Sequence, residues 1–124
     1  MSEQIEGGCF CGSVRYRFPI NDYRSSNCHC SMCRSISGAP YVAWMAIPVD
    51  DFEYLKGEPK KLISSSHGSR YFCHDCGTPV VCLLEEYPEY TYITTCSLDK
   101  PEDFAPKGDM YTDDMLPWVK KGNL

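Results

Sequence analysis

Seven of the nine cysteines in this 124-residue sequence fall into three tight groups. The groups are Cys9-Phe10-Cys11, Cys28-His29-Cys30-Ser31-Met32-Cys33 and Cys73-His74-Asp75-Cys76. Cysteines one or two residues apart direct their sulfur atoms at a common point when the backbone makes a tight turn. Gly12 and Gly77 directly follow two of the groups, where such a turn could use a positive φ. This spacing is typical of metal ligands.

A disulfide framework is the competing interpretation of so many cysteines. Disulfide frameworks are typical of small secreted chains with an even number of cysteines, whereas this number is odd. The first eight residues contain Glu3 and Glu6 and lack the basic start and apolar stretch of a secretory signal. We therefore expect bound metal rather than disulfides, and a cytoplasmic location.

Four of the clustered cysteines can close one tetrahedral site. A Cys-x-x-Cys pair shares a Zn²⁺ ion with a second pair, and the natural partner of Cys73 and Cys76 is the pair Cys9 and Cys11. A closed site of four thiolates has no position for a substrate. We expect this zinc to be structural and to join the N-terminal strand to the region around residue 75.

The remaining group, Cys28, Cys30 and Cys33, supplies three ligands and leaves one tetrahedral position open. Three thiolates make zinc a weak Lewis acid, which argues against hydrolysis. A sulfur-rich site suits a fourth sulfur ligand, and binding lowers the pKa of an incoming thiol. The sequence therefore predicts two Zn²⁺ ions per chain and a thiol substrate that binds at the second one.

Short strands must position these groups, because the sequence reads as a mainly β protein of one domain over residues 1–124. The clearest strand is Ser13 to Phe18, where apolar and basic residues alternate. Six more strands are expected at Tyr41 to Ile47, Phe52 to Lys56, Lys61 to Ser65, Ser69 to Phe72, Pro79 to Leu84 and Tyr90 to Cys96. Helices are expected to be limited to a turn or two near Ser31 to Ile36 and Pro101 to Phe104.

Composition excludes two classes of partner. The 12 basic and 17 acidic residues give a net charge of -5 without any basic block, which disfavours nucleic acid as a partner. No apolar run reaches the ~18 to 20 residues of a membrane helix. We expect a small-molecule thiol substrate, and the sequence makes no prediction of oligomeric state.

Four segments together resemble the glutathione-dependent formaldehyde-activating enzyme family, which also includes centromere protein V. They are Gly7-Gly8-Cys9-Phe10-Cys11-Gly12, Cys28-His29-Cys30-Ser31-Met32-Cys33-Arg34, Arg70-Tyr71-Phe72-Cys73-His74-Asp75-Cys76-Gly77-Thr78 and Ser97-Leu98-Asp99. The resemblance implies a β-tent fold of small antiparallel sheets built around zinc. It implies a structural zinc on Cys9, Cys11, Cys73 and Cys76, and a catalytic zinc on Cys28, Cys30 and Cys33. The implied activity is that of a carbon-sulfur lyase that joins formaldehyde to glutathione as S-hydroxymethylglutathione.

One departure from the family bears on the substrate. Many relatives have a histidine where this sequence has Asp109. Glutathione has two carboxylates, so an acid bordering the pocket would disfavour it and make another thiol or another aldehyde plausible. We expect a lyase similar to S-(hydroxymethyl)glutathione synthase, acting with glutathione or another small thiol. The alternatives are a non-catalytic zinc module that binds a protein partner and a thiol redox protein using Cys28 to Cys33.

Three histidines have mainly structural interpretations. His29 and His74 lie within the ligand groups, where a hydrogen bond near a ligand or a solvent-facing position is expected rather than metal ligation. His67 lies in a Ser-rich turn and is expected in an exposed hairpin loop, with a contact to a substrate carboxylate as the alternative.

Two arginines and two cysteines complete the candidates. Arg34 and Arg70 each adjoin a cysteine group, where a cation could hold thiolate charge, receive a substrate carboxylate or donate to a developing alkoxide. Exposure to solvent is the alternative for both. Cys82 and Cys96 lie in expected strands and are predicted to be buried small hydrophobes, with a resolving thiol as the alternative.

Overall fold

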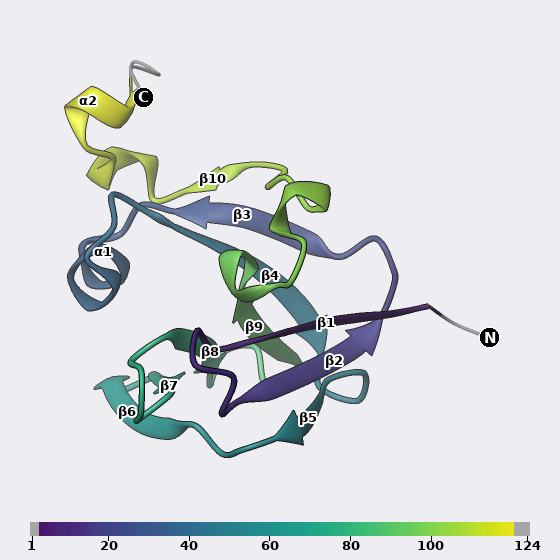
Figure 1. Cartoon of the computed structure of the whole chain (residues 1–124). Helices are drawn as coiled ribbons and strands as arrows, with labels where there is room; N and C mark the ends of the chain where they lie inside the picture. The colour runs from purple at the N-terminus through teal and green to yellow at the C-terminus, as the bar shows by residue number, and fades with distance from the viewer. Residues whose placement is uncertain (1–2, 121–124) are drawn as a thin grey trace.

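The computed structural model describes residues 3–120 and consists mainly of short strands in two sheets (Figure 1). The smaller sheet has the order β1-β2-β5 and the larger one the order β10-β3-β4-β9-β8-β7-β6. The strands are β1 (Gln4–Gly8), β2 (Arg15–Pro19), β3 (Arg24–Cys28), β4 (Val42–Pro48), β5 (Glu53–Lys56), β6 (Lys60–Ser65), β7 (Gly68–Phe72), β8 (Pro79–Leu84), β9 (Tyr90–Thr94) and β10 (Asp109–Met110). Every named pair is antiparallel except β10 and β3, which are parallel. The prediction of a mainly β, tent-like fold is confirmed.

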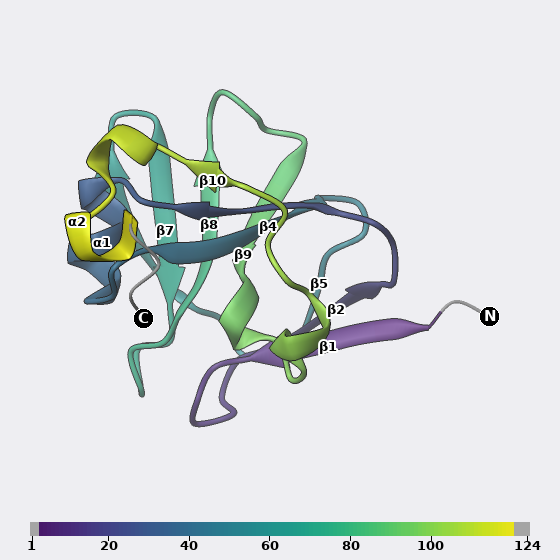
Figure 2. The ribbon, with the colours of Figure 1, turned by 90° about the horizontal axis from the view of Figure 1, so that it is seen from above.

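Helices are short and lie between the strands or near the C-terminal end. The α-helices are α1 (Ser31–Ser37) and α2 (Pro117–Lys120), and the 3₁₀-helices are η1 (Thr95–Ser97), η2 (Pro101–Asp103) and η3 (Thr112–Asp114). The two predicted helical segments are therefore confirmed as α1 and η2. Figures 1 and 2 both show α1 and α2 at the same end of the molecule.

All seven predicted strands are present, with ends that differ by at most two residues. The strand expected to reach Cys96 ends at Thr94, because residues 95–97 turn into η1. Sequence reasoning did not find β1, β3 and β10. The β3 sequence, Arg-Ser-Ser-Asn-Cys, has no apolar alternation, and its pairing with β4 and β10 supplies the hydrogen bonds that make it a strand.

The main core lies between the two sheets. Tyr16 and Phe18 of β2, Ile47 of β4 and Ile93 of β9 are fully buried there. Burial of each such side chain stabilises the fold by roughly 1.5 to 3 kcal/mol relative to exposure. The alternation that predicts β2 therefore identifies its buried face correctly, since Arg15 and Arg17, which alternate with Tyr16 and Phe18, are only partly buried.

A second, smaller cluster lies on the other face of the larger sheet. Its buried members are Cys28, Cys33, Trp44 and Cys82. Successive residues of a strand point to opposite faces, and the neighbours Met45 and Val81 belong to the main core. The larger sheet therefore separates the main core from a cysteine-containing face.

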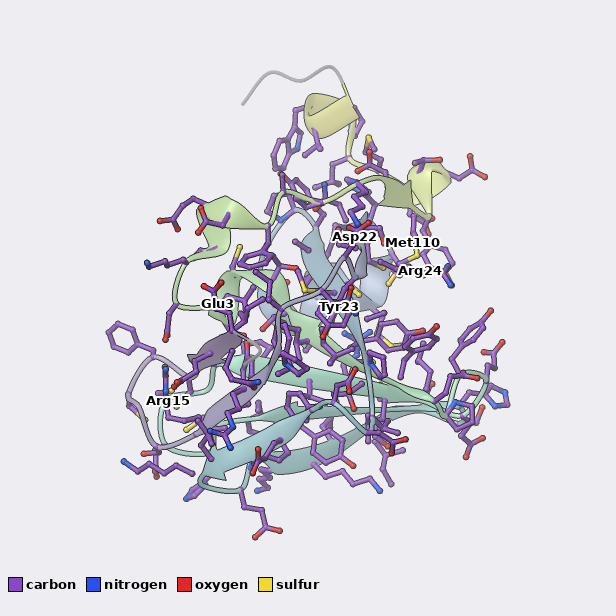
Figure 3. The ribbon with its side chains drawn as sticks, turned by 90° about the vertical axis from the view of Figure 1, so that its right-hand side faces the viewer. Glu3, Arg15, Asp22, Tyr23, Arg24 and Met110 are labelled. Atoms are coloured by element: carbon purple, nitrogen blue, oxygen red, sulfur yellow. The ribbon has the colours of Figure 1, made fainter. Side chains whose placement is uncertain are left out.

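A C-terminal segment lies along the outer edge of the larger sheet beside β3. The Lys107 ammonium contacts the Asp22 carboxylate and donates to the carbonyl oxygen of Tyr23 at 2.9 Å. The His29 amide donates to the Met110 carbonyl at 3.0 Å. Figure 3 shows Asp22, Tyr23, Arg24 and Met110 on one side of the molecule, away from Arg15.

No helix within residues 3–120 is long and apolar enough to cross a membrane. The single domain expected over residues 1–124 stays a prediction.

Candidate functional site

Four cysteine sulfur atoms meet where the turn after β1 approaches the turn after β7. The sulfur atoms of Cys9, Cys11, Cys73 and Cys76 all lie within 4.8 Å of one another. We call this group the four-cysteine cluster. The Cys11 sulfur lies 3.6 Å from the Cys9 sulfur and 3.7 Å from the Cys73 sulfur. Zinc-sulfur bonds of ~2.3 Å in a tetrahedron place sulfur atoms about 3.8 Å apart, so this cluster fits a Zn²⁺ ion.

The two turns that hold the four-cysteine cluster have the same backbone conformation at their glycines. Gly12 and Gly77 both have a φ of 83°. The Gly12 amide donates to the Cys9 carbonyl at 3.2 Å, and the Gly77 amide donates to the Cys73 carbonyl at 2.7 Å. The expected positive φ is confirmed at both positions, where it reverses the chain so that both cysteines of each pair face the same point.

Thr78 links the two turns and favours the thiolate form of one cysteine. Its hydroxyl oxygen lies 3.2 Å from the Cys76 sulfur and accepts a hydrogen bond from the Phe10 amide at 3.1 Å. Hydrogen bonds from the Thr78 side chain and then its backbone lower the pKa of Cys76 to about 5. Thiolate is the form that binds a metal, so Thr78 supports ligation. Thr78 is the last residue of the family-like segment that begins at Arg70, but the sequence alone indicates no role for it.

The second cluster, the cysteine triplet, is formed where β3 ends and α1 begins. The sulfur atoms of Cys28, Cys30 and Cys33 lie within 4.8 Å of one another. Cys28 is the last residue of β3, and Cys30 caps the N-terminus of α1 by accepting from the Cys33 amide at 3.3 Å. Cys28 and Cys33 are buried, and Cys30 is half-buried. The start of the helix therefore brings three thiols together, and no other described His, Cys, Asp or Glu has a ligand atom within 4.8 Å of all three.

Protonation differs between members of the triplet. The Cys33 sulfur lies 3.4 Å from the Cys28 sulfur. The hydrogen bond between the Cys28 and Cys33 thiols, followed by one from Arg70, lowers the pKa of Cys33 to about 5. The same hydrogen bond and burial raise the pKa of Cys28. Cys33 is thus the member that most readily carries negative charge.

Of the two candidate arginines, only Arg70 contacts a cysteine sulfur within the described residues. Its Nη2 atom donates to Cys33 Sγ at 3.5 Å, and its guanidinium carbon lies 5.8 Å from the centre of the Trp44 ring. Arg34 instead donates to the carbonyl oxygens of His29, at 2.9 Å, and Asp114. Arg34 therefore holds α1 against the C-terminal segment. The contact of Arg70 with Trp44 was not foreseen, because the two residues are far apart in the sequence.

A cavity of about 340 Å³ adjoins the triplet at Cys33. Its wall includes Arg70, Trp44 and Leu62, so β4, β6 and β7 all contribute to it. Cys33 is the one clustered cysteine in its wall, which also includes Phe72, the last residue of β7, and Gly77 in the turn that follows. The triplet is therefore the cluster that contributes a sulfur-bearing residue to the cavity wall.

Asp109 does not bring negative charge to the cavity wall, contrary to the expectation from the sequence. Its Oδ1 atom lies 2.8 Å from Nε2 of His29, and it is not part of the cavity wall. The His29 hydrogen bond is the main cause of a lowered pKa of Asp109. His29 is 1% exposed, which rules out the solvent-facing interpretation, and it belongs to neither sulfur cluster. The pair joins the segment after β3 to β10.

The remaining candidates divide between correct and wrong predictions. His67 and His74 have exposed side chains, as expected for loop residues. Cys82 is buried beside the triplet, also as expected. The prediction for Cys96 is wrong, since it lies in η1 and is exposed.

The fold and the two sulfur clusters define a mainly β protein with two candidate metal centres, one closed and one beside a cavity. A family model described as glutathione-dependent formaldehyde-activating enzyme matches residues 4–114. The chain belongs to this family.

Two curated relatives and one solved structure are similar to the chain. It is 28% identical to an uncharacterized lyase of Schizosaccharomyces pombe, over 90% of this chain and 93% of the relative. It is 26% identical to a putative glutathione-dependent formaldehyde-activating enzyme of Halomonas elongata, over 77% of this chain and 66% of the relative. A Rhodobacter sphaeroides protein of known crystal structure shares the fold, with a TM-score of 0.69, 20% identity, and coverage of 85% of this chain and 99% of that one.

Proposed function

We propose that this protein is a zinc-dependent carbon-sulfur lyase that adds glutathione or another small thiol to formaldehyde or a related aldehyde. The observation that carries the proposal is the contrast between the two sulfur clusters. The four-cysteine cluster has a full set of ligands, whereas the triplet has three and adjoins a cavity. Family membership and the names of the two curated relatives support lyase chemistry of this kind.

The residues at the triplet have different roles in this proposal. A Zn²⁺ ion on Cys28, Cys30 and Cys33 would lower the pKa of a thiol that fills its fourth position, so that the thiol reacts as a thiolate. Cys28 is buried and anchors the triplet to β3. Cys33 lies in the cavity wall and faces the substrate. Arg70 neutralises part of the thiolate charge at Cys33.

The four-cysteine cluster holds a structural zinc in the same proposal. It joins the turn after β1 to the turn after β7, and these strands belong to different sheets. The fit of its sulfur spacings to a tetrahedral ion supports this role. Cytoplasmic location and the absence of a nucleic-acid partner stay predictions.

A non-catalytic interaction module of the same fold would need a closed site for stability. It would need neither a three-ligand cluster nor a cavity with a guanidinium beside that cluster. These two features favour the enzyme over the module.

Exchange NMR with a matched pair of cysteine variants tests the function. Hemithioacetals form without a catalyst, so adduct exchange is compared with the uncatalysed rate for formaldehyde with glutathione and with other small thiols. The wild type and Cys96→Ser should accelerate exchange equally, since Cys96 is exposed and lies outside both clusters. Cys30→Ser should lose at least about 100-fold of the acceleration, because the metal loses one of three ligands. If no thiol exchanges faster with the wild type than with Cys30→Ser, the interaction module replaces the lyase.

A further inference from the structure

The cavity beside the triplet is much larger than formaldehyde. Its volume is about 340 Å³, whereas formaldehyde has only two non-hydrogen atoms and occupies little more than the ~30 Å³ of one water molecule. A substrate that used this cavity for binding would need a substituent to fill it. The apolar part of the wall includes Ile36, Val42, Trp44, Leu62, Phe72 and Pro79.

The chemistry of the wall suits a hydrocarbon group better than a peptide. Arg70 is the one cationic side chain among the described residues that line the cavity. Glutathione has two carboxylates and an ammonium group, and an apolar wall would leave most of these groups without partners. The cavity is therefore matched to the other reactant, the carbonyl compound, provided that this compound has an apolar substituent.

Arg70 stands at the junction between the cavity and the triplet. Its Nη2 atom contacts Cys33 at 3.5 Å, and the Trp44 ring packs against its guanidinium. Its Nε atom is buried and has no hydrogen-bond partner within the described residues. Cys33 supplies the one hydrogen-bond acceptor for this guanidinium in that part of the chain, whereas Arg34 is already bonded to two carbonyl oxygens. Arg70 thus has donors left for a new oxygen beside Cys33.

We infer that the carbonyl substrate is an aldehyde with an apolar, branched or aromatic substituent, and that Arg70 donates to its oxygen. This inference rests on the proposed thiol addition. The substituent lies along Trp44 and Leu62, and the carbonyl group faces the triplet. The substrate thiol loses its proton, its sulfur forms a bond to the carbonyl carbon, and the π electron pair moves to the oxygen. Arg70 stabilises that alkoxide by hydrogen bonding and remains a cation, and the proton lost by the thiol returns through solvent to give the neutral hemithioacetal.

A cavity-filling substitution with a neighbour as control tests the substrate class. Leu62 lines the cavity and is 42% exposed, so a tryptophan there can occupy the cavity without a new burial inside the core. Ile63 is the next residue of β6 and is absent from this wall. Acceleration over the uncatalysed rate is measured with glutathione for 3-methylbutanal and for formaldehyde. In Leu62→Trp, the acceleration for 3-methylbutanal should fall about tenfold or more, and the acceleration for formaldehyde should change less than about twofold. Ile63→Trp should change neither acceleration.

A binding measurement separates the aldehyde site from catalysis. Trp118→Phe leaves Trp44 as the single tryptophan, and its fluorescence reports on the cavity wall. Titration of the zinc-loaded protein without thiol should give saturable quenching with 3-methylbutanal and none with formaldehyde at the same concentrations. Leu62→Trp is not used in this titration, because it would add a second tryptophan. Leu62→Phe should weaken the binding of 3-methylbutanal.

Arg70→Met and Arg70→Lys test the oxygen donor. Arg70→Met should retain zinc and the Trp44 response to 3-methylbutanal, but lose about 100-fold in kcat, the usual cost of removing one such donor. Arg70→Lys should recover part of the loss. Loss of zinc from Arg70→Met with kcat per bound zinc unchanged would overturn the donor role and leave Arg70 as a support for the metal.

The outcomes distinguish this inference from the proposed function. If the wild type accelerates thiol addition to formaldehyde but not to 3-methylbutanal, the proposed lyase function stands and the inference is overturned. A change in preference among thiols, rather than aldehydes, in Leu62→Trp also overturns it, because the thiol then occupies the cavity. If neither aldehyde reacts faster with the wild type than with Cys30→Ser, the proposed function itself fails.

Discussion

At the scale of single residues, neighbouring groups decide which thiol carries charge. Cys33 and Cys76 have pKa values lowered to about 5 by hydrogen bonds with Cys28 and Thr78, respectively. These thiols are of the same type as Cys82, whose pKa is raised by burial. Cysteines at different positions therefore differ in pKa because of burial and one or two neighbouring contacts.

The motif Ser97-Leu98-Asp99 has a structural role at this scale. The Ser97 hydroxyl lies 2.6 Å from the Tyr16 hydroxyl, and Leu98 is 4% exposed. Both oxygens of Asp99 accept from Arg15, at 2.9 and 2.6 Å. The motif thus joins the segment after β9 to β2, and within the described residues its side chains make no hydrogen bond to a clustered cysteine.

Replacement of Asp99 by asparagine should have a small, pH-dependent effect. The Arg15 hydrogen bonds lower the pKa of Asp99, so its stabilising contribution is present above the ordinary carboxyl pKa and is lost as pH falls. Since Arg15 and Asp99 are partly exposed, we expect Asp99→Asn to reduce the free energy of unfolding by about 0.5 to 1 kcal/mol at pH 7.

Urea unfolding of the wild type and Asp99→Asn at pH 8, 6 and 4 checks this, with the zinc content of both proteins measured and matched at each pH. The difference between wild type and Asp99→Asn should be equal at pH 8 and 6 and smaller at pH 4. Asp113→Asn is the control, because Asp113 forms no ion pair within residues 3–120. A difference that grows toward pH 4 would contradict the assigned contact.

At the scale of elements, the cysteine clusters depend on chain reversals and on one helix start. Two turns with left-handed glycines form the four-cysteine cluster, and the N-terminus of α1 forms the triplet. These local conformations explain the close spacing of the cysteines in sequence. They do not explain which groups meet, because that depends on how β1 and β7 are placed by the two sheets.

Gly77→Ala should destabilise the turn after β7. A side chain at a φ of 83° costs about 1 to 2 kcal/mol, and the distorted turn should also hold metal less tightly. Gly108→Ala is the matched control, since Gly108 lacks a positive φ and a Cβ atom there would have no neighbour within 4 Å. Thermal unfolding and zinc content of both variants measure the effect. Equal stability of the two variants would show that the left-handed conformation is not required.

At the scale of the whole molecule, the two clusters differ in what they connect. The four-cysteine cluster joins turns of the two sheets, whereas the triplet lies within one segment between β3 and α1. Loss of the first cluster should release one sheet from the other. Loss of the second should leave the main core, which contains none of the triplet residues, in place.

Serine variants and a chelator should therefore separate the clusters. Cys76→Ser is expected to lower the free energy of unfolding by several kcal/mol, because a structural zinc contributes directly to folding, and Cys30→Ser by about 1 kcal/mol. A mild chelator should remove the triplet metal first and leave the circular dichroism spectrum unchanged. Elemental analysis and thermal unfolding provide the measurements. Equal losses of stability in the two variants, or a folded protein with fewer than two zinc ions per fully reduced chain, would refute the division.

The sequence by itself determined the strands with alternating apolar residues, the positive φ after two cysteine groups and the grouping of seven cysteines. These features are local, since turn conformation and strand periodicity depend on neighbours in the chain. Only the tertiary structure decided that β3 is a strand, that Cys96 is exposed, and that His29 pairs with Asp109. It also decided which of Arg34 and Arg70 contacts a sulfur of the triplet, because Arg70 reaches Cys33 from a strand that is distant in the sequence. Contacts of this kind follow from strand register and sheet order, which the spacing of residues along one chain does not encode.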